Sequence, residues 1–293
     1  MRDLLMDYVV KRISSAADFL TRTVIFRDEH PMETNIMGSV AGSVASGSRT
    51  YPTCFWWLVL QGEVIVGIAM RTVPYRLVVS PMPEGAAARL AHAVWEHDPE
   101  CWGVNGPEAS TTEFIKCWCA ESGRPVSDFP IYMRETIYVL DRHTPRVGVS
   151  GSSRMATEND VPLLLTWLAE FVVEAGLSNS EIPDSDVLLT RLRSTPILLW
   201  EREGRPVAMA GHAAIVEDPQ GRTGRIGPVF TEPSERGNGY GAAVTSSMID
   251  HLRSIDCARI MLYTNSDYAK SNRVYQQLGF VAKGAILELG HGQ

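Results

Sequence analysis

The chain has 293 residues, of which 45% are apolar, and its formal net charge at pH 7 is −7. This length and apolar content suit one large folded domain or two of ordinary size. A net negative chain has no overall attraction for nucleic acid or for an anionic membrane, so an anionic ligand must be held by local positive groups.

The five cysteines are odd in number and irregularly spaced, so we expect reduced thiols. Cys117 and Cys119 resemble the start of a metal site, but no second pair at ligand spacing follows, and we expect no metal. The N-terminal stretch MRDLLMDYVV carries acids, and no run of about 18 uncharged apolar residues occurs. We therefore expect a soluble cytoplasmic protein without a membrane partner.

The first half of the chain contains alternating strand and helix patterns. Two β-rich runs with a turn at Gly62 predict a hairpin over residues 54–72. A short strand follows at 76–80, then a helix at 85–97 and a second helix at 110–123.

The second half repeats this order. A hairpin is predicted over 196–217 around Gly204. After it come a strand over 225–230, a helix from Gly241, a strand over 258–265 and a helix over 269–279. The offset between the halves is roughly 140 residues, which indicates a duplication, although a coincidence of α/β patterning remains the alternative.

The join between the two halves falls in a stretch rich in Pro, Gly and Ser, residues 141–153. We therefore predict two tandem domains with mixed sheets, 1–145 and 151–293.

Within the second half, the helix after Gly241 has one apolar face. Val244, Met248, Leu252 and Ile255 recur at helical spacing and should pack on a sheet. The strands before and after this helix then form a right-handed parallel βαβ unit.

Three glycines, Gly237, Gly239 and Gly241, lie where this unit passes from strand to helix, beside Arg236. A helix amino terminus offers unpaired N–H groups and a partial positive charge, and glycine lets an anion approach closely. An arginine can add a bidentate contact to phosphate. A tight turn with a solvated arginine is the alternative, but the combination favours a phosphate site.

A dinucleotide-binding loop is a competing interpretation, because Gly237, Gly239 and Ala242 fit its loose fingerprint. The segment TEPSER separates these glycines from the strand, the next strand ends in Asn265 rather than an acid, and only one βα unit remains before the chain stops. These features oppose it.

The pattern Arg236-x-x-Gly239-x-Gly241 resembles the acyl-CoA signature of the GNAT N-acetyltransferase superfamily. The stretch SNRVYQQLGF, residues 271–280, resembles a second motif of that family, with a tyrosine four residues before Gly-Phe. The resemblance covers residues 151–293 and implies an α+β fold with a mixed sheet and acetyl-CoA as co-substrate.

The resemblance also implies where the coenzyme binds. Its pyrophosphate would lie on the amides of residues 236–241, and its pantetheine arm along strand residues 229–231, in a gap where this strand separates from residues 259–265. Asn272 would face the coenzyme, although many family members carry their asparagine at the position of Tyr268. The implied coenzyme-binding residues are Val229, Phe230, Thr231, Arg236, Gly237, Asn238, Gly239, Tyr240, Gly241 and Asn272.

Tyr275 is the predicted general acid, because a phenol within reach can protonate the thiolate that leaves a thioester. A main-chain N–H near Phe230 would stabilise the oxyanion. Glu174 is the predicted base that takes the proton of the incoming amine, and His212 is a second candidate. Each of these side chains also has an ordinary structural interpretation, as a packed tyrosine, a surface acid and a satisfied strand histidine.

Glu181, Asp184 and Asp186 follow Glu174, and their acidity is consistent with a cationic acceptor or with a solvated loop.

The first half lacks these motifs. The loop before its helix at 85–97, residues 81–84, has no arginine, and Cys119 stands where the second half has Tyr275. We expect a related domain that has lost the coenzyme site and covers the working half, with residues 34–52 as a candidate flexible lid; a purely stabilising domain is the alternative.

The sequence thus predicts a transferase that moves acetyl from acetyl-CoA directly to an amine, which we expect to belong to a small molecule. A non-catalytic acyl-CoA sensor is the alternative function. The sequence identifies neither the acceptor, nor the acyl-chain preference, nor the oligomeric state.

Overall fold

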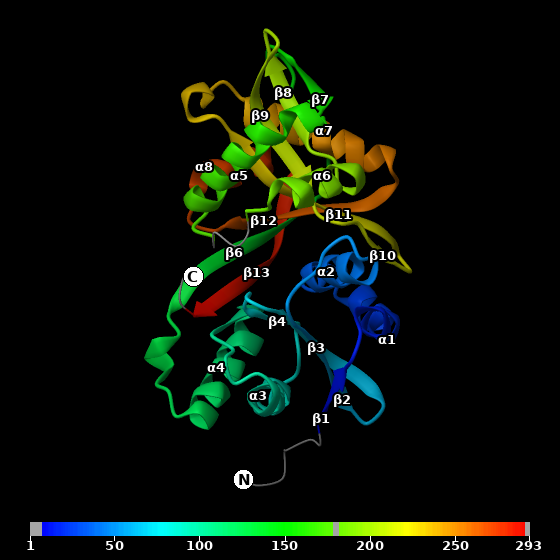
Figure 1. The fold of residues 1–293 in the computed structure, drawn as a ribbon, viewed down its shortest axis with the longest axis vertical. Helices are drawn as coiled ribbons and strands as arrows, with labels where there is room; N and C mark the ends of the chain where they lie inside the picture. The colour runs from blue at the N-terminus through cyan, green and yellow to red at the C-terminus, as the bar shows by residue number, and fades with distance from the viewer. Residues whose placement is uncertain (1–7, 178–181, 291–293) are drawn as a thin grey trace. The chain divides into compact units, whose positions relative to one another are not determined.

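The hairpins predicted around Gly62 and Gly204 are both present in the computed structural model, which describes residues 8–177 and 182–290 (Figure 1). Each hairpin turns at a glycine with positive φ, 62° at Gly62 and 75° at Gly204, a conformation that glycine adopts without a Cβ penalty. Chain contacts divide the structure into two units.

The first unit contains most of residues 8–135 together with Asp218–Gln220 and the end of the last strand from Gly284. Its elements are β1 (Tyr8–Ile13), α1 (Ala16–Glu29), α2 (Asn35–Ala45), β2 (Cys54–Gln61), β3 (Val64–Thr72), β4 (Leu77–Val79), α3 (Ala86–His97), β5 (Gly103–Gly106), α4 (Glu108–Ser122), a short 3-10 turn (Val126–Asp128) and the start of β6 (Ile131–Leu140).

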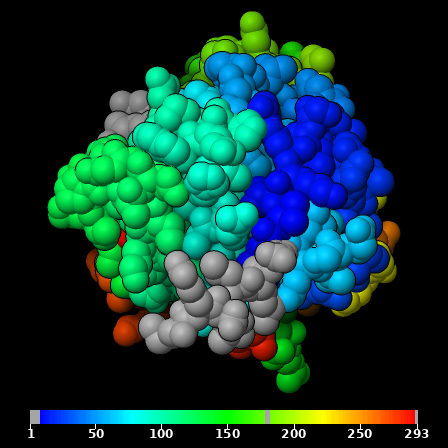
Figure 2. All heavy atoms as spheres, turned by 90° about the horizontal axis from the view of Figure 1, so that it is seen from below, coloured from blue at the N-terminus to red at the C-terminus, as the bar shows by residue number. Residues whose placement is uncertain are grey.

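The strands of this first unit are ordered β1-β2-β3-β4-β5-β13, where β13 (Phe280–Gly290) is the last strand of the chain. β4 and β5 are parallel, and their neighbours on both sides are antiparallel, so the sheet is mixed. α3 packs on α4 and on β1, and Figure 2 shows one face of this unit, with the cyan to green atoms of α3 and α4 beside the blue N-terminal elements.

The prediction of a flexible lid at residues 34–52 is wrong for most of that stretch. Residues 35–45 form α2, which contacts α1. Met37 and Ala41 are fully buried in a core cluster with Phe19 and Trp56. Glycine, serine and alanine suggest mobility in sequence, but here these small side chains let α2 pack closely on its neighbour.

The second unit covers residues 136–217 and 221–283. Besides the ends of β6 and β13, its elements are β7 (Ser152–Met155), a 3-10 turn (Glu158–Asp160), α5 (Val161–Glu174), α6 (Ser185–Ser194), β8 (Leu198–Arg202), β9 (Arg205–His212), β10 (Val216–Asp218), β11 (Gly221–Thr231), a second 3-10 turn (Pro233–Glu235), α7 (Tyr240–Ser254), β12 (Cys257–Asn265) and α8 (Ala269–Gln277).

Its strand order is β13-β6-β12-β11-β9-β8-β7. β11 and β12 are parallel, which confirms the predicted βαβ unit through α7.

Alternating strand residues of the second unit serve two cores, as expected for a sheet covered on both faces. Trp200 and Ala208 lie in a cluster with Val244, Met248 and Leu252 of α7. Leu199 and Met209, one position away, lie instead in a cluster with residues of α5 and α6. The predicted apolar face of α7 is therefore confirmed.

No helix in the described part of the chain has the length and apolar character needed to cross a membrane. Nor do the described residues contain a group of three or more His, Cys, Asp or Glu side chains placed to hold a metal ion.

Candidate active site

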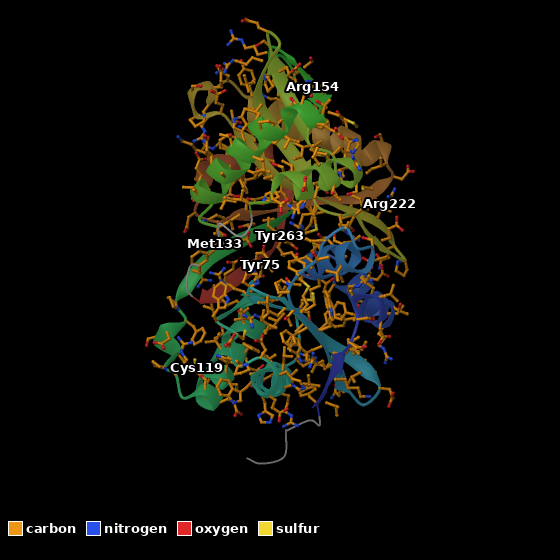
Figure 3. The ribbon with its side chains drawn as sticks, in the orientation of Figure 1. Tyr75, Cys119, Met133, Arg154, Arg222 and Tyr263 are labelled. Atoms are coloured by element: carbon orange, nitrogen blue, oxygen red, sulfur yellow. The ribbon has the colours of Figure 1, made fainter. Side chains whose placement is uncertain are left out.

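β11 and β12 begin as paired strands and then separate. Their parallel register runs from Arg222 opposite Cys257 to Arg225 opposite Met261, and both strands continue beyond the last pair. Tyr263, labelled in Figure 3, lies on the part of β12 past this point. The pairing of β11 with β12 therefore ends before residues 229–231, for which the gap was predicted.

On its other edge, β11 remains bonded to β9. Val229, Phe230 and Thr231 pair with Ala210, Met209 and Ala208, after an irregularity that follows Ile226. Residues 226–231 therefore have a strand partner in β9 but no pairing with β12 in the described structure. The backbone groups that face β12 are available to an extended ligand in the gap, as an exposed strand edge is.

The glycine loop follows this open strand after one short turn. A 3-10 turn, Pro233–Glu235, separates Thr231 from the loop, and α7 begins at Tyr240 after Gly239, whose φ is 84°. The first backbone hydrogen bond of the helix runs from the Ala243 N–H to the Gly239 carbonyl, at 3.0 Å. The amides from Gly237 to Ala242 have no acceptor in the described part of the chain, so they form a potential anion site.

Two other side chains of the loop have structural contacts. Tyr240 is 2% exposed and anchors the start of α7 in the core. The Asn238 side-chain amide donates to the Glu235 carbonyl at 3.0 Å. These residues can therefore serve a ligand through their main-chain amides.

Arg236 and Glu174 form an ion pair. One guanidinium nitrogen of Arg236 lies 2.6 Å and 2.8 Å from the two carboxylate oxygens of Glu174, and its Nε donates to the Thr231 carbonyl at 3.1 Å. Both side chains are 46% exposed, and exposed pairs of this kind are worth about 1 kcal/mol or less. Arg236, predicted to bind phosphate, and Glu174, the predicted base, thus bind each other. Their ion pair is weak enough for a bound anion to break it.

The pairing of Arg236 with Glu174 could not be read from the sequence, because 62 positions separate the two residues. Tyr268 also holds Glu174 in place, since its hydroxyl donates to the Glu174 carbonyl at 2.8 Å. It occupies the position at which many relatives were expected to carry asparagine.

Asn272 joins the end of β12 to α8. Its side-chain nitrogen donates to the carbonyls of Asn265 and Ser266 at 3.2 Å and 3.1 Å. Its side-chain oxygen is buried and has no partner within the described residues. An N–H of a bound ligand would satisfy this oxygen, which otherwise costs free energy.

Tyr275 lies on α8, half-buried against the core cluster, with its ring 6.1 Å from that of Phe280. Its phenol makes no hydrogen bond within the described part of the chain. Burial raises the pKa of Tyr275 to about 12, so the phenol is protonated at neutral pH and can donate a hydrogen bond.

His212 lies at the far end of α7. Its ring is 5.8 Å from that of His251, which follows Tyr240 by eleven residues, or about 16 Å along the helix. Nδ1 lies 2.7 Å from the Ala213 carbonyl, and Nε2 is buried without a partner in the described residues. Burial lowers the pKa of His212. The structure therefore places this second candidate base away from the glycine loop.

The acidic stretch after Glu174 has one clear structural role. Asp184 caps α6, accepting a hydrogen bond from the Val187 N–H at 2.8 Å. Asp186 is exposed in the first turn of the same helix. Glu181 lies outside the described residues.

The corresponding helix start in the first unit is already occupied. α3 begins after Gly85, whose φ is 84°, as α7 begins after Gly239. The Gly85 N–H donates to the Glu113 carboxylate of α4 at 2.7 Å. A carboxylate from the chain itself therefore binds the N-cap residue of α3, the position that Gly239 has before α7. Cys119, labelled on α4 in Figure 3, is buried in the core of this unit.

This fold and this site define a class of protein. Residues 164–280 match the family described as the Acetyltransferase (GNAT) family. The match includes the open strand, the glycine loop and Tyr275. The chain therefore carries a GNAT acetyltransferase domain.

Whole-chain comparisons show the tandem arrangement. A tandem GNAT protein from the clavulanic acid biosynthesis pathway has 12% identity, a TM-score of 0.58, and coverage of 97% of this chain and 98% of its own. A GNAT-family acetyltransferase from Colwellia psychrerythraea has 13% identity, a TM-score of 0.59, and coverage of 96% and 99%. At these identities the likeness shows the fold: two tandem GNAT-like domains.

Among curated proteins, the chain is similar to a mycothiol acetyltransferase of Parafrankia sp., with 40% identity over 72 residues, which are 24% of this chain and 22% of that protein. A mycothiol acetyltransferase of Saccharopolyspora erythraea is 36% identical over 68 residues, or 23% of this chain. The match spans about a fifth of the length of these relatives, 22% in each case.

The raised pKa of Tyr275 has a consequence for alkaline stability. The pKa of Tyr275 is about 12 in the folded protein, and 10.0 is the ordinary value expected in the unfolded chain. The contribution of this difference to the free energy of unfolding is complete below pH 10 and is lost as the pH rises through 12. We expect the free energy of unfolding to fall over this range by more in the wild-type protein than in Tyr275→Phe. Urea unfolding at pH 7 and pH 11 measures both; equal losses would contradict the assignment of a buried phenol.

Proposed function

We propose that residues 151–293 form a domain that binds acetyl-CoA and transfers its acetyl group directly to an amine of a small molecule. One observation carries this proposal: the open edge of β11 leads into unpaired amides at the start of α7, within the segment that matches the GNAT family. The two features suit the two parts of the coenzyme, an amide-bearing arm and a diphosphate.

The residues present fit the coenzyme in three respects. The amides of residues 237–242 lack acceptors among the described residues and can bind diphosphate oxygens. The edge of residues 229–231 can pair with the amides of the pantetheine arm, as a strand pairs with an extended peptide. The buried oxygen of Asn272 can accept an N–H.

When bound, acetyl-CoA supplies the activated thioester. We propose that the main-chain N–H near Phe230 stabilises the oxyanion as the amine attacks. The protonated Tyr275 then donates a hydrogen bond to the departing sulfur and transfers its proton as the C–S bond breaks. A pKa near 12 ensures that the phenol carries its proton at the start of the reaction.

The ion pair between Arg236 and Glu174 suggests how a base is supplied. Diphosphate oxygens compete with the Glu174 carboxylate for the guanidinium, since both accept its fork of donors. We propose that coenzyme binding draws Arg236 to the diphosphate and leaves Glu174 to accept the proton of the amine. This order would make the base available when the thioester is present.

The acceptor is proposed as a small-molecule amine in view of the similar proteins named mycothiol acetyltransferase. We further propose that residues 1–145 are a degenerate GNAT-like domain without a coenzyme site. The bond from the Gly85 N–H to Glu113 supports this proposal. The carboxylate occupies a donor at the helix start that would receive a phosphate, and its negative charge repels a phosphate there.

Titration calorimetry with CoA tests the binding part of the proposal. We expect one coenzyme per chain, because within the described residues the unpaired start of α7 is the one that follows both a glycine loop and an open strand edge. Two sites per chain would show that the first domain also binds. No heat of binding, checked by a thermal-shift assay, would remove the proposed function.

Substitution of Tyr275 by Phe tests the chemical role. We expect kcat, measured as CoA released with a panel of amines, to fall about 100-fold, as loss of a general acid does, with little change in CoA affinity. Tyr138→Phe is the matched control, because Tyr138 lies in the same core cluster and its hydroxyl accepts a hydrogen bond from the Gln276 side chain at 3.0 Å. Equal losses of turnover and affinity would reduce Tyr275 to a packing residue.

Glu174→Gln tests the base. At saturating acetyl-CoA we expect turnover to fall about 100-fold, because glutamine cannot take the proton. Unchanged turnover would mean that Glu174 serves only as the partner of Arg236. If wild-type protein binds CoA but releases no thiol with any amine, the non-catalytic sensor is the better function.

A further inference from the structure

The segment between β6 and β7 is fixed on the second unit beside the glycine loop. The N–H groups of Asp141 and Arg142 donate to the Gly279 carbonyl at 3.0 Å and 3.4 Å, and that of Thr144 donates to Leu278 at 3.0 Å. Gly279 is required here, because a Cβ would come within 1.7 Å of the Arg142 carbonyl oxygen. The start of the segment therefore packs tightly on the end of α8.

His143 then fastens the segment to α7. Its side chain is 3% exposed, with Nε2 2.9 Å from the Ser246 hydroxyl and Nδ1 3.4 Å from the Asp250 carboxylate. The Arg146 N–H also donates to the Ser246 hydroxyl, at 3.4 Å. Ser246 is 6% exposed on a packed helix face, so this serine, histidine and aspartate hold the backbone in place and do not present a nucleophile.

Arg146 consequently reaches the glycine loop. A Cβ placed on Gly239 would lie 3.6 Å from both Nε and one terminal nitrogen of the Arg146 guanidinium, and 3.4 Å from Val149. Gly239 is the residue that precedes α7, so this cation lies beside the unpaired amides at the helix start.

The two arginines near the loop differ in their partners. Arg236 is held by Glu174 and Thr231. The Arg146 guanidinium is exposed and makes no ion pair or hydrogen bond within the described residues. Its backbone is fixed while its charge remains available, which is the arrangement that suits an anionic ligand.

We propose that Arg146 binds the diphosphate of the coenzyme, as a second cation contributed by the connecting segment. This inference rests on the proposed function, since it assigns a further residue to the same site. A fork of N–H donors from Arg146 would meet diphosphate oxygens already held by the loop amides. The signature motif of the loop does not include this residue.

Calorimetric titration of CoA into the full chain tests this role. Arg146→Ala should weaken CoA binding about tenfold, as expected for a lost charge-assisted contact, and Arg146→Lys should recover part of the loss. Arg142→Ala is the matched control: it removes the same charge from the same segment, but Arg142 contributes only its main chain to the contacts with α8. We expect its affinity to remain within about twofold of wild type.

Dephospho-CoA, which lacks the 3′-phosphate, distinguishes the two phosphate groups of the coenzyme. An equal weakening of CoA and dephospho-CoA by Arg146→Ala supports contact with the diphosphate. A loss seen only with CoA would overturn that assignment. Equal affinities of Arg146→Ala and Arg142→Ala would overturn the inference as a whole, whereas failure of wild-type protein to bind CoA would instead remove the proposed function. Melting temperatures of the variants establish that each is folded.

Discussion

The separation of β11 from β12 is the constraint on which the candidate site depends. Main-chain N–H and C=O groups inside a sheet must find partners, and the described part of β11 beyond Arg225 pairs with β9 but not with β12. The unpaired side leads directly to the glycine loop. Because α7 packs through Val244, Met248 and Leu252, the loop is fixed on a rigid element at the end of this open strand.

The positive charge at the glycine loop comes from individual nearby side chains and not from the net charge of the chain. The chain is acidic overall, yet two arginines approach the same helix start from different segments. One is neutralised by a glutamate and the other is not. Such an arrangement allows an anion to be attracted by Arg146 and then to compete with Glu174 for Arg236. Binding of the anion and release of the Glu174 carboxylate are then connected through the Arg236 guanidinium.

The sequence predicted those parts of the structure that depend on neighbours along the chain. Both hairpins, the parallel βαβ unit and the apolar face of α7 followed from local turn residues and periodicity. Contacts between distant residues were not predictable in this way: Arg236 with Glu174, His143 with Ser246, and Gly85 with Glu113. Residues 35–45 were misread because small residues occur both in mobile loops and in closely packed helices.

The bond between Gly85 and Glu113 has a consequence for how the two helix starts respond to their surroundings. A carboxylate that belongs to the chain is present at a constant effective concentration, so the Gly85 N–H before α3 has an acceptor whatever metabolites are present. Under the proposed function, the start of α7 takes its anion from solution, so its occupancy depends on the concentration of the coenzyme. In calorimetric unfolding scans, added CoA would accordingly raise the unfolding temperature of the second unit and leave that of the first unit unchanged.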